Sequence, residues 1–389
     1  MLTTEHPTAI AATRPTGPTS SRNLLRRVLA SPIVDRLTAP YGIDRYLELV
    51  DPRWAVHRTR AEVVAVDRQT RGTVTLTLRP NDVWAGFQAG QHVDVGVDID
   101  GTIHHRSFSL AGSPNHPEGL LELTIKANPA GRVRRHLVDR ARPGMLLRLS
   151  EARGEFILPA IDQRTRPLVL ISGGSGITPV LSMLRTLVDD GHSGPVTFVH
   201  YAQSEADVCY PDELRRLVAA LPDGRLLFGF PDEASAVAKK AGRLPGFFGA
   251  KHLAAITDDP NSVDVYLCGP APLMASVEHH FADLGLSDRV HLERFGLPPL
   301  DPDLDVGDGT VAFNRSLLTV AAEGTLLETA EAAGVDPAFG CRRGICGTCT
   351  TTKTAGRVRN IVTGQESNND TEPIRLCVSV ACGDVTLDL

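Results

Sequence analysis

The spacing of hydrophobic and polar positions changes three times along this chain, and each spacing predicts a different kind of structure. Residues 24–29 carry leucine and valine at helical spacing, with Ser21 as a candidate N-cap. Pro32 is expected to end or kink that helix. A turn at residues 39–42 (APYG) then leads into a second short helix, which the pattern predicts at Ile43–Val50.

From about residue 60 apolar and polar positions alternate, which is the period of a half-buried β-strand. Turns rich in Gly, Pro and Asp separate the strands, and Asp100-Gly101 is a good hairpin turn. Several short strands within a hundred residues predict a small antiparallel β-barrel, with the helical segment RVRRHLVDRA near its end. The expected strands are AEVVAVDR, GTVTLTLRP, QHVDVGVDID, GLLELTIKA and GMLLRLSE.

The pattern changes again at Arg166, where RPLVLISGGSGITPVLSMLRTLVDDG is typical of a buried strand, a glycine-rich turn and a helix. Later segments repeat this order, which predicts a parallel α/β sheet of nucleotide-binding type. Residues 298–309, rich in Pro, Asp and Gly, are the expected linker to a compact α+β segment. The expected domains are 1–59 (disordered tail and helical arm), 60–160 (β-barrel), 161–298 (parallel α/β domain) and 299–389 (α+β domain).

Composition narrows the class of protein. A chain of 389 residues is too long for one ordinary core, and 42% hydrophobic with 22% charged residues is typical of a soluble globular protein. The chain has no apolar run long enough to predict a membrane-spanning helix, and its start lacks the order of a signal peptide. Seven cysteines, an odd number bunched at one end, do not resemble a secreted disulfide framework. We therefore expect a cytoplasmic protein.

Charge is spread unevenly along the chain. Residues 301–389 hold thirteen acids against seven bases, whereas residues 1–60 hold nine arginines against five acids. The acidic C-terminal part argues against binding of nucleic acid and favours an acidic docking face. The arm has two interpretations: it packs on its own domain, or it is a basic amphipathic element that rests on a membrane surface or a membrane-bound partner.

The cysteines carry the clearest chemistry. Cys341, Cys346 and Cys349 have the C-x4-C-x2-C spacing of plant-type [2Fe-2S] ferredoxins, which need a fourth cysteine further on. Cys377 and Cys382 both qualify by position. A zinc site usually takes paired C-x2-C knuckles, of which only one is present, and a redox disulfide needs no third and fourth cysteine. The glycines of FGCRRGICGTC suit a tight loop whose N–H groups point at cluster sulfurs.

Three further motifs resemble segments of the ferredoxin reductase family. RSFSL (residues 106–110) resembles its flavin-binding strand, GGSGITP (173–179) and CGP (268–270) its nicotinamide-binding loops, and HLERFG (291–296) its terminal segment. The glycines let the backbone approach a cofactor, and a helix N-terminus favours a phosphate. The order of the motifs implies a β-barrel flavin domain, an α/β nicotinamide domain and a β-grasp ferredoxin domain.

The resemblance implies roles for residues of the flavin motif. Arg106 pairs with a flavin phosphate, Phe108 lies against the isoalloxazine, and Ser109 sits near the flavin N5 where hydride arrives. Ser107, within the same motif, is also expected to bind the cofactor. In the family a G-x-x-S turn follows and contacts the flavin pyrophosphate, and here Arg134 replaces its serine. FAD remains favoured over FMN as the cofactor. The corresponding turn residues are Gly131, Arg132, Val133 and Arg134.

The resemblance also assigns the nicotinamide loops. Cys268 lies close to the hydride-donating carbon of the nicotinamide. The alternative, if this residue is taken alone, is a buried cysteine at a strand end. Glu293 and Phe295 border the active site, or are an exposed charge and a packing aromatic. The loop after the second strand carries Glu205 and no base, which favours NADH over NADPH unless an arginine comes from elsewhere. The remaining expected cofactor-binding residues are Gly173, Gly174, Gly176, Thr178, Gly269 and Pro270.

The C-terminal segment LCVSVACGDVTLDL resembles the ferredoxin ending in which the ligand cysteine precedes an aspartate by seven positions. Cys377 and Asp384 fit that register, so Cys382 is expected to be a buried neighbour. Arg342 and Arg343 lie in the cluster loop and are expected to meet either the flavin domain or the acceptor. The implied metal ligands are Cys341, Cys346, Cys349 and Cys377.

Residues 60–389 as a whole resemble single-chain reductase components, which pass electrons from NAD(P)H through FAD and a [2Fe-2S] cluster to a terminal oxygenase or a membrane-bound acyl desaturase. The arm makes the chain most similar to actinobacterial reductases that serve acyl-CoA desaturases, and reductases of steroid or aromatic-ring hydroxylases are also similar. A free-standing NAD(P)H dehydrogenase and a non-enzymatic iron–sulfur sensor are the alternatives. The expected catalytic residues are Ser109, Cys268 and Glu293, and the arm is expected to make peripheral membrane contact.

Overall fold

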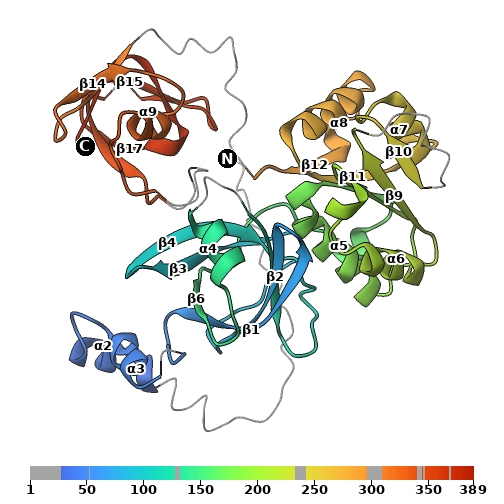
Figure 1. Ribbon diagram of the computed structural model, residues 1–389, viewed down its shortest axis with the longest axis horizontal. Coiled ribbons are helices and arrows are strands. Elements are labelled where there is room, and N and C mark those ends of the chain that lie inside the picture. Colours follow the sequence, from blue (N-terminus) through green and yellow to red (C-terminus); the bar gives the residue numbers. More distant parts are fainter. Residues whose placement is uncertain are drawn as a thin grey trace, which may run out of the picture.

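The computed structural model describes residues 28–51, 53–127, 132–232, 242–295, 309–339, 344, 347–367 and 369–389. These residues form three separate β-sheets, in the order that the sequence predicts (Figure 1). The multidomain class with an antiparallel, a parallel and a C-terminal mixed sheet is therefore confirmed. Within the same ranges, every helix is too short or too polar to cross a bilayer.

The first sheet is antiparallel and has the strand order β4-β3-β6-β1-β2-β5. A bridge between Leu110 and Leu123 joins the two ends of this order and closes the barrel. Alternate residues point into one apolar core, as the two-residue period predicts, and α4 (Arg132–Arg140) adds Val133 and Leu137 to it. The strands are β1 (Thr59–Thr70), β2 (Thr73–Pro80), β3 (His92–Ile99), β4 (Thr102–Ser109), β5 (Leu121–Lys126) and β6 (Leu146–Leu149).

The second sheet is parallel throughout, in the order β10-β9-β8-β7-β11-β12. Helices α5 and α6 belong to the core on one face, and α7 and α8 to the core on the other, so the expected parallel α/β sheet has helices on both faces (Figure 1). The strands are β7 (Leu168–Gly173), β8 (Val196–Tyr201), β9 (Gly224–Phe230), β10 (Arg243–Pro245), β11 (Asp264–Cys268) and β12 (Val290–Glu293). The helices are α5 (Ile177–Asp189), α6 (Pro211–Ala220), α7 (Ala250–Ile256) and α8 (Ala271–Asp283).

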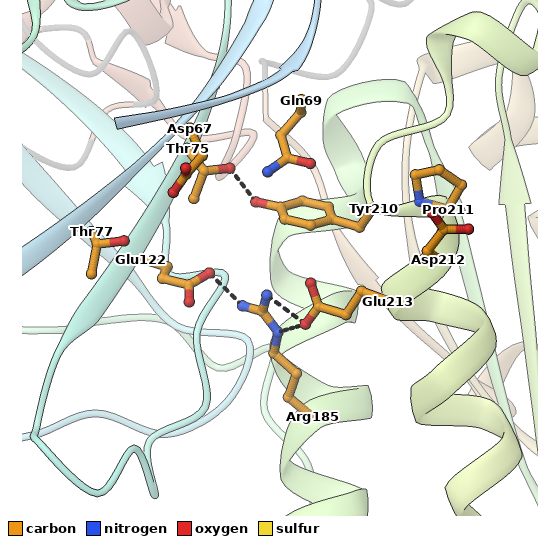
Figure 2. Close-up of a pocket in the computed structure, with 10 residues that line it drawn as sticks. All are labelled: Asp67, Gln69, Thr75, Thr77, Glu122, Arg185, Tyr210, Pro211, Asp212 and Glu213. Atoms are coloured by element: carbon orange, nitrogen blue, oxygen red, sulfur yellow. Dashed lines mark hydrogen bonds and ion pairs between the residues drawn. The ribbon is translucent and has the colours of Figure 1, made fainter. Parts of the chain in front are cut away.

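A polar seam joins these two domains around a pocket of about 300 Å³ (Figure 2). Arg185 on α5 donates 2.7 Å to Glu122 of the barrel and 2.8 Å to Glu213 on α6. Burial opposes its charge, but the two carboxylates outweigh burial and raise the pKa of Arg185. The hydroxyl of Tyr210 is hydrogen-bonded to Thr75 and Thr124, and burial raises its pKa to about 12, so it stays neutral.

The third sheet has the order β14-β13-β18-β15-β16, with β17 also paired to β15. Helix α9 packs Leu326, Leu327 and Ala330 into its core, and a Thr325–Glu328 capping box starts the helix. This is the predicted α+β domain. Its elements are β13 (Thr310–Phe313), β14 (Leu318–Ala321), α9 (Leu326–Ala332), β15 (Thr350–Asn360), β16 (Glu366–Ser367), β17 (Glu372–Arg375) and β18 (Ser379–Leu387).

The arm contains α2 (Pro32–Leu37) and α3 (Ile43–Val50), the latter with the bounds that the sequence predicts. Pro32 begins α2 instead of only ending the helix before it, because Ser31 caps that new helix through the N–H of Val34. The expected helix at residues 24–29 lies almost wholly outside the described residues.

Lys353 is fully buried in the third domain. Its ammonium donates to the carbonyls of Gly356 (2.6 Å) and Asn369 and lies 3.3 Å from Glu372. A buried charge is retained only when such partners surround it.

We predict that Lys353→Met destabilises this domain by about 3 kcal/mol, because it leaves Glu372 and two carbonyls without a donor. Scanning calorimetry should show the transition of the domain lowered by about 12 °C or more. Arg315→Gln, which breaks an exposed pair with Asp388, is the control and should leave the transition unchanged. Equal transitions in both variants would contradict the prediction.

Candidate functional site

The three residues predicted to be catalytic converge from two domains. Ser109 ends β4 of the barrel, and its hydroxyl lies 3.4 Å from Glu293 Oε2 at the end of β12. Cys268 ends the adjacent β11 and pairs with Glu293 in the strand register. All three are buried, with exposed fractions of 5% for Ser109 and Glu293 and 0% for Cys268. The alternative interpretation of Glu293 as an exposed charge is therefore wrong.

The glycines of the predicted nicotinamide loops permit close packing at the carboxyl ends of β7 and β11. A Cβ on Gly176 would lie 2.1 Å from the carbonyl oxygen of Cys268, and one on Gly173 would lie 2.7 Å from Pro270. Thr178 donates 3.2 Å to the carbonyl of Ser175 and closes the turn before α5. Ligands of open α/β sheets bind beside the carboxyl ends of the strands, so this packing shapes a cofactor site.

A pocket of about 390 Å³ opens at this edge. Two cations that sequence reasoning missed lie at it: Lys126 from the end of β5 and Arg294, which is also ion-paired with Glu278. Positive charge and backbone N–H groups together suit a dinucleotide pyrophosphate. The lining residues are Lys126, Gly173, Gly174, Ser175, Gly269, Pro270, Ala271, Met274, Arg294 and Phe295.

Residues 106–109 of the flavin motif form the last part of β4, whose end lies at this edge. Phe108 and Ser109 are buried, Arg106 is partly buried, and the hydroxyl of Ser107 donates to Asp94 on β3. The side chain of Ser107 is therefore engaged within the barrel, although the sequence assigns this residue to the cofactor.

The N-terminal turn of α4 fits an anionic phosphate. Arg134 is partly buried, burial lowers its pKa, and no acid pairs with it among the described residues. A desolvated cation of this kind is stabilised by a bound anion. Val133 packs into the barrel core, Arg132 is exposed, and Gly131 lies outside the described residues.

Two buried histidines adjoin the site, and the sequence pattern singled out neither. His92 pairs with Ser109 across β3 and β4, and its Nδ1 lies 3.5 Å from Glu293 Oε1. His200 on β8 shares a 2.9 Å hydrogen bond with Ser172, and burial, with a smaller effect of Lys126, lowers its pKa to about 4. Both histidines are identified by strand register and burial. These two properties cannot be read from residue spacing in the sequence.

At the end of β8, the alternative that the sequence left open, an arginine from elsewhere in the chain, is the one that the structure has. Arg243 on β10 is ion-paired with Glu205 at 2.6 Å, and its guanidinium lies 4.7 Å from the ring centre of Phe230. The pair neutralises the carboxylate that favoured a free ribose hydroxyl. It also supplies an arginine at the strand end where a 2′-phosphate is recognised.

In the third domain, Cys349 and Cys377 are buried next to each other, and the N–H of Leu376 donates 3.1 Å to the carbonyl of Cys349. The N–H of Gly344 donates 3.2 Å to Cys377 Sγ. Gly344 has φ +73°, and a Cβ on it would lie 2.7 Å from Val378. A thiolate that accepts a backbone N–H in a loop too tight for a side chain fits an iron–sulfur cluster.

Cys382 lies on β18 and is only partly buried, whereas Cys377 lies in the turn before β18 and is buried, so the expectation that Cys382 is a buried neighbour is wrong. Asp384 accepts 2.9 Å bonds from the N–H and hydroxyl of Thr310, which tie β18 to β13 and lower the pKa of Asp384. Cys341, Cys346, Arg342 and Arg343 lie outside the described residues, so their assignments stay predictions.

Three family models match this chain, in the order of the three sheets. They describe an oxidoreductase FAD-binding domain at residues 61–157, an oxidoreductase NAD-binding domain at 170–279 and a 2Fe-2S iron–sulfur cluster binding domain at 312–382.

Relatives of similar length match too. The chain is 34% identical to an NADPH oxidoreductase of Mycobacterium tuberculosis, over 100% of this chain and 97% of that protein. It is 30% identical to the glycine betaine monooxygenase reductase subunit of Pseudomonas aeruginosa, over 86% and 96%. Among solved structures, phthalate dioxygenase reductase has the same fold, with a TM-score of 0.55 and 24% identity over 85% of this chain and 97% of that one.

We predict that Glu293→Gln lowers turnover with NAD(P)H and ferricyanide about 10²-fold, since it removes the charged acceptor beside the Ser109 hydroxyl. Stopped-flow absorbance measures the rate, and flavin content should not change. The exposed substitution Glu118→Gln is the control. A rate for Glu293→Gln equal to that of the control would contradict the prediction.

We predict opposite effects for the two partners of the Glu205–Arg243 pair. Glu205→Gln should lower KM for NADPH about tenfold because it removes the carboxylate that is ion-paired with Arg243, and Arg243→Ala should raise it by a similar factor. Steady-state kinetics with both nucleotides measure this, and KM for NADH should change little. Parallel changes for NADH and NADPH would show that the pair does not face a 2′-phosphate.

Proposed function

The chain belongs to the family of FAD- and NAD(P)H-dependent oxidoreductases with a C-terminal 2Fe-2S domain, and we propose that it is the reductase component of a multi-protein oxygenase or desaturase system. The observation that carries the proposal is the convergence of Ser109, Glu293 and Cys268 from two domains, with the buried Cys349–Cys377 pair in a third.

The cofactors divide the chemistry. Bound FAD accepts a hydride and passes electrons on singly, which NAD(P)H cannot do, and a [2Fe-2S] cluster takes one electron at a time. Arg106, Arg134 and the start of α4 would hold the flavin phosphates. Gly173, Gly269 and Pro270 would form the floor of the nicotinamide site.

The role of the chain is to hold and orient the cofactors and to accept a proton. Each NAD(P)H releases one proton for the two electrons that leave, so a proton acceptor is required near the site of hydride transfer. Glu293 Oε2 supplies it, because it lies within hydrogen-bonding distance of Ser109 Oγ and is shielded from bulk water. Cys268, at the end of β11, would lie against the nicotinamide.

The proposed acceptor is a second protein. Relatives of this chain are named as reductase components of glycine betaine, propane and 3-ketosteroid monooxygenases, which supports a terminal oxygenase. A membrane-bound acyl desaturase is the acceptor that the arm favours. We include in the proposal that the arm makes peripheral membrane contact, since its helices expose large apolar side chains.

The visible spectrum of the purified protein tests the proposal. Flavin bands and the broad absorption of an iron–sulfur cluster should both be present, and NADPH or NADH should bleach them. A colourless protein that contains zinc would contradict it.

We predict that Cys377→Ser abolishes the cluster absorption and the reduction of a protein acceptor such as cytochrome c, while reduction of ferricyanide persists at the flavin. Cys382→Ser is the matched control and should keep the cluster, because this residue is not among the proposed ligands. Loss of the cluster in the Cys382 variant alone would reverse the assignment. Persistent reduction of the protein acceptor without the cluster would favour a free-standing dehydrogenase.

A further inference from the structure

Helix α3 packs with its polar side toward the protein. The carboxylate of Asp44 is buried and accepts the N–H of Val56 at 2.7 Å and that of His57 at 3.2 Å. Glu48, one turn further on, is ion-paired with Arg60 at the start of the barrel, where the side chain of Arg60 is only 6% exposed. The side of the helix that meets the protein therefore carries two acids with engaged charges, beside the partly buried Ile43 and Leu47.

The opposite side of α3 is apolar and faces outward. Tyr46, Leu49 and Val50 are 46%, 74% and 73% exposed, and their spacing of three and four residues places them on one face. A helix on the surface of a soluble domain normally has the reverse orientation, with its apolar stripe against the core. In this helix Tyr46, Leu49 and Val50 of the apolar stripe instead lie on the exposed side, where they are available to a partner.

The rest of the arm continues the pattern. Ile33 and Leu37 on α2 are 70% and 80% exposed and lie one turn apart, and Tyr41 and Trp54 are also exposed. In Figure 1 the arm extends away from the three sheets. We name these side chains the outward face of the arm: Ile33, Leu37, Tyr41, Tyr46, Leu49, Val50 and Trp54.

The charges beside the outward face select the partner. Arg36 and Arg45 are exposed, and no acid pairs with either among the described residues. The acids Asp44 and Glu48 are engaged with the protein, and Asp51 is paired with Arg53 at 2.7 Å. The arm thus offers apolar and aromatic side chains flanked by arginines, which is the composition that binds the interface of an anionic bilayer.

We propose that the outward face of the arm seats on an anionic lipid surface, with its apolar side chains below the headgroups and Arg36 and Arg45 at the headgroup phosphates. This deepens the membrane contact included in the proposed function and rests on it. A second copy of the chain fits less well, because a twofold contact through this face would bring the same arginines together.

Vesicle flotation with the full-length holoprotein tests the proposal. The protein should float with phosphatidylcholine vesicles that contain phosphatidylglycerol, and its partition coefficient should fall about tenfold with phosphatidylcholine alone or at high salt. The variant Leu37→Ser/Leu49→Ser/Val50→Ser should lose binding about tenfold or more. Arg36→Gln/Arg45→Gln should lose the preference for anionic vesicles. Phe247→Ser/Leu317→Ser removes two exposed apolar side chains outside the arm and should bind as the wild type does.

Absence of flotation by the wild type, or equal flotation of the Leu37 triple variant, would overturn the proposal. Gel filtration in parallel that shows a dimer dissociated by the same triple variant would assign the face to a second copy and also overturn it. Ferricyanide reduction by NADPH is measured in every sample, because it depends on the reductase site and not on the arm. Failed flotation with intact reduction rejects the lipid contact alone, and failed reduction rejects the reductase function.

Discussion

The active arrangement depends on the polar seam between the barrel and the nucleotide domain. Ser109 and Glu293 come from opposite sides of it, so their 3.4 Å contact exists only while the domains keep one relative position. Arg185 holds that position through carboxylates on both sides, and Tyr210 inserts its hydroxyl between two threonines of the barrel. Directional hydrogen bonds and ion pairs specify a position more sharply than apolar contact does.

The molecule buries polar groups where position matters and exposes apolar groups where a partner is expected. Arg185 and Lys353 are surrounded by acceptors, and each orders elements that are distant in the sequence. The arm has the opposite arrangement, since Asp44 is buried while Leu49 and Val50 are exposed. Both departures from the usual distribution of polar and apolar side chains have a cost in stability, which makes a functional role the simplest explanation for each.

Local patterns predicted much of the fold. The two-residue period located the barrel strands, and the glycine-rich turns located the parallel sheet, because backbone geometry and burial repeat over a few residues. Helix α3 has its predicted bounds. The sequence could not identify the arginine that pairs with Glu205, because Arg243 lies 38 positions away along the chain and no local period connects them. His92 and Lys126 were missed for the same reason.

The sequence by itself determined the order and type of the domains and the candidate cluster cysteines, because hydrophobic periods and cysteine spacings are properties of short segments. The residues predicted to be catalytic came from the resemblance of short motifs to a known family. Tertiary structure decided which of these meet. It brought Ser109 to Glu293 and turned Asp44 of α3 toward the protein. It also buried Cys377 and left Cys382 only partly buried. These outcomes follow from register and from packing between distant segments, whose energies depend on the whole fold and leave no period in the sequence.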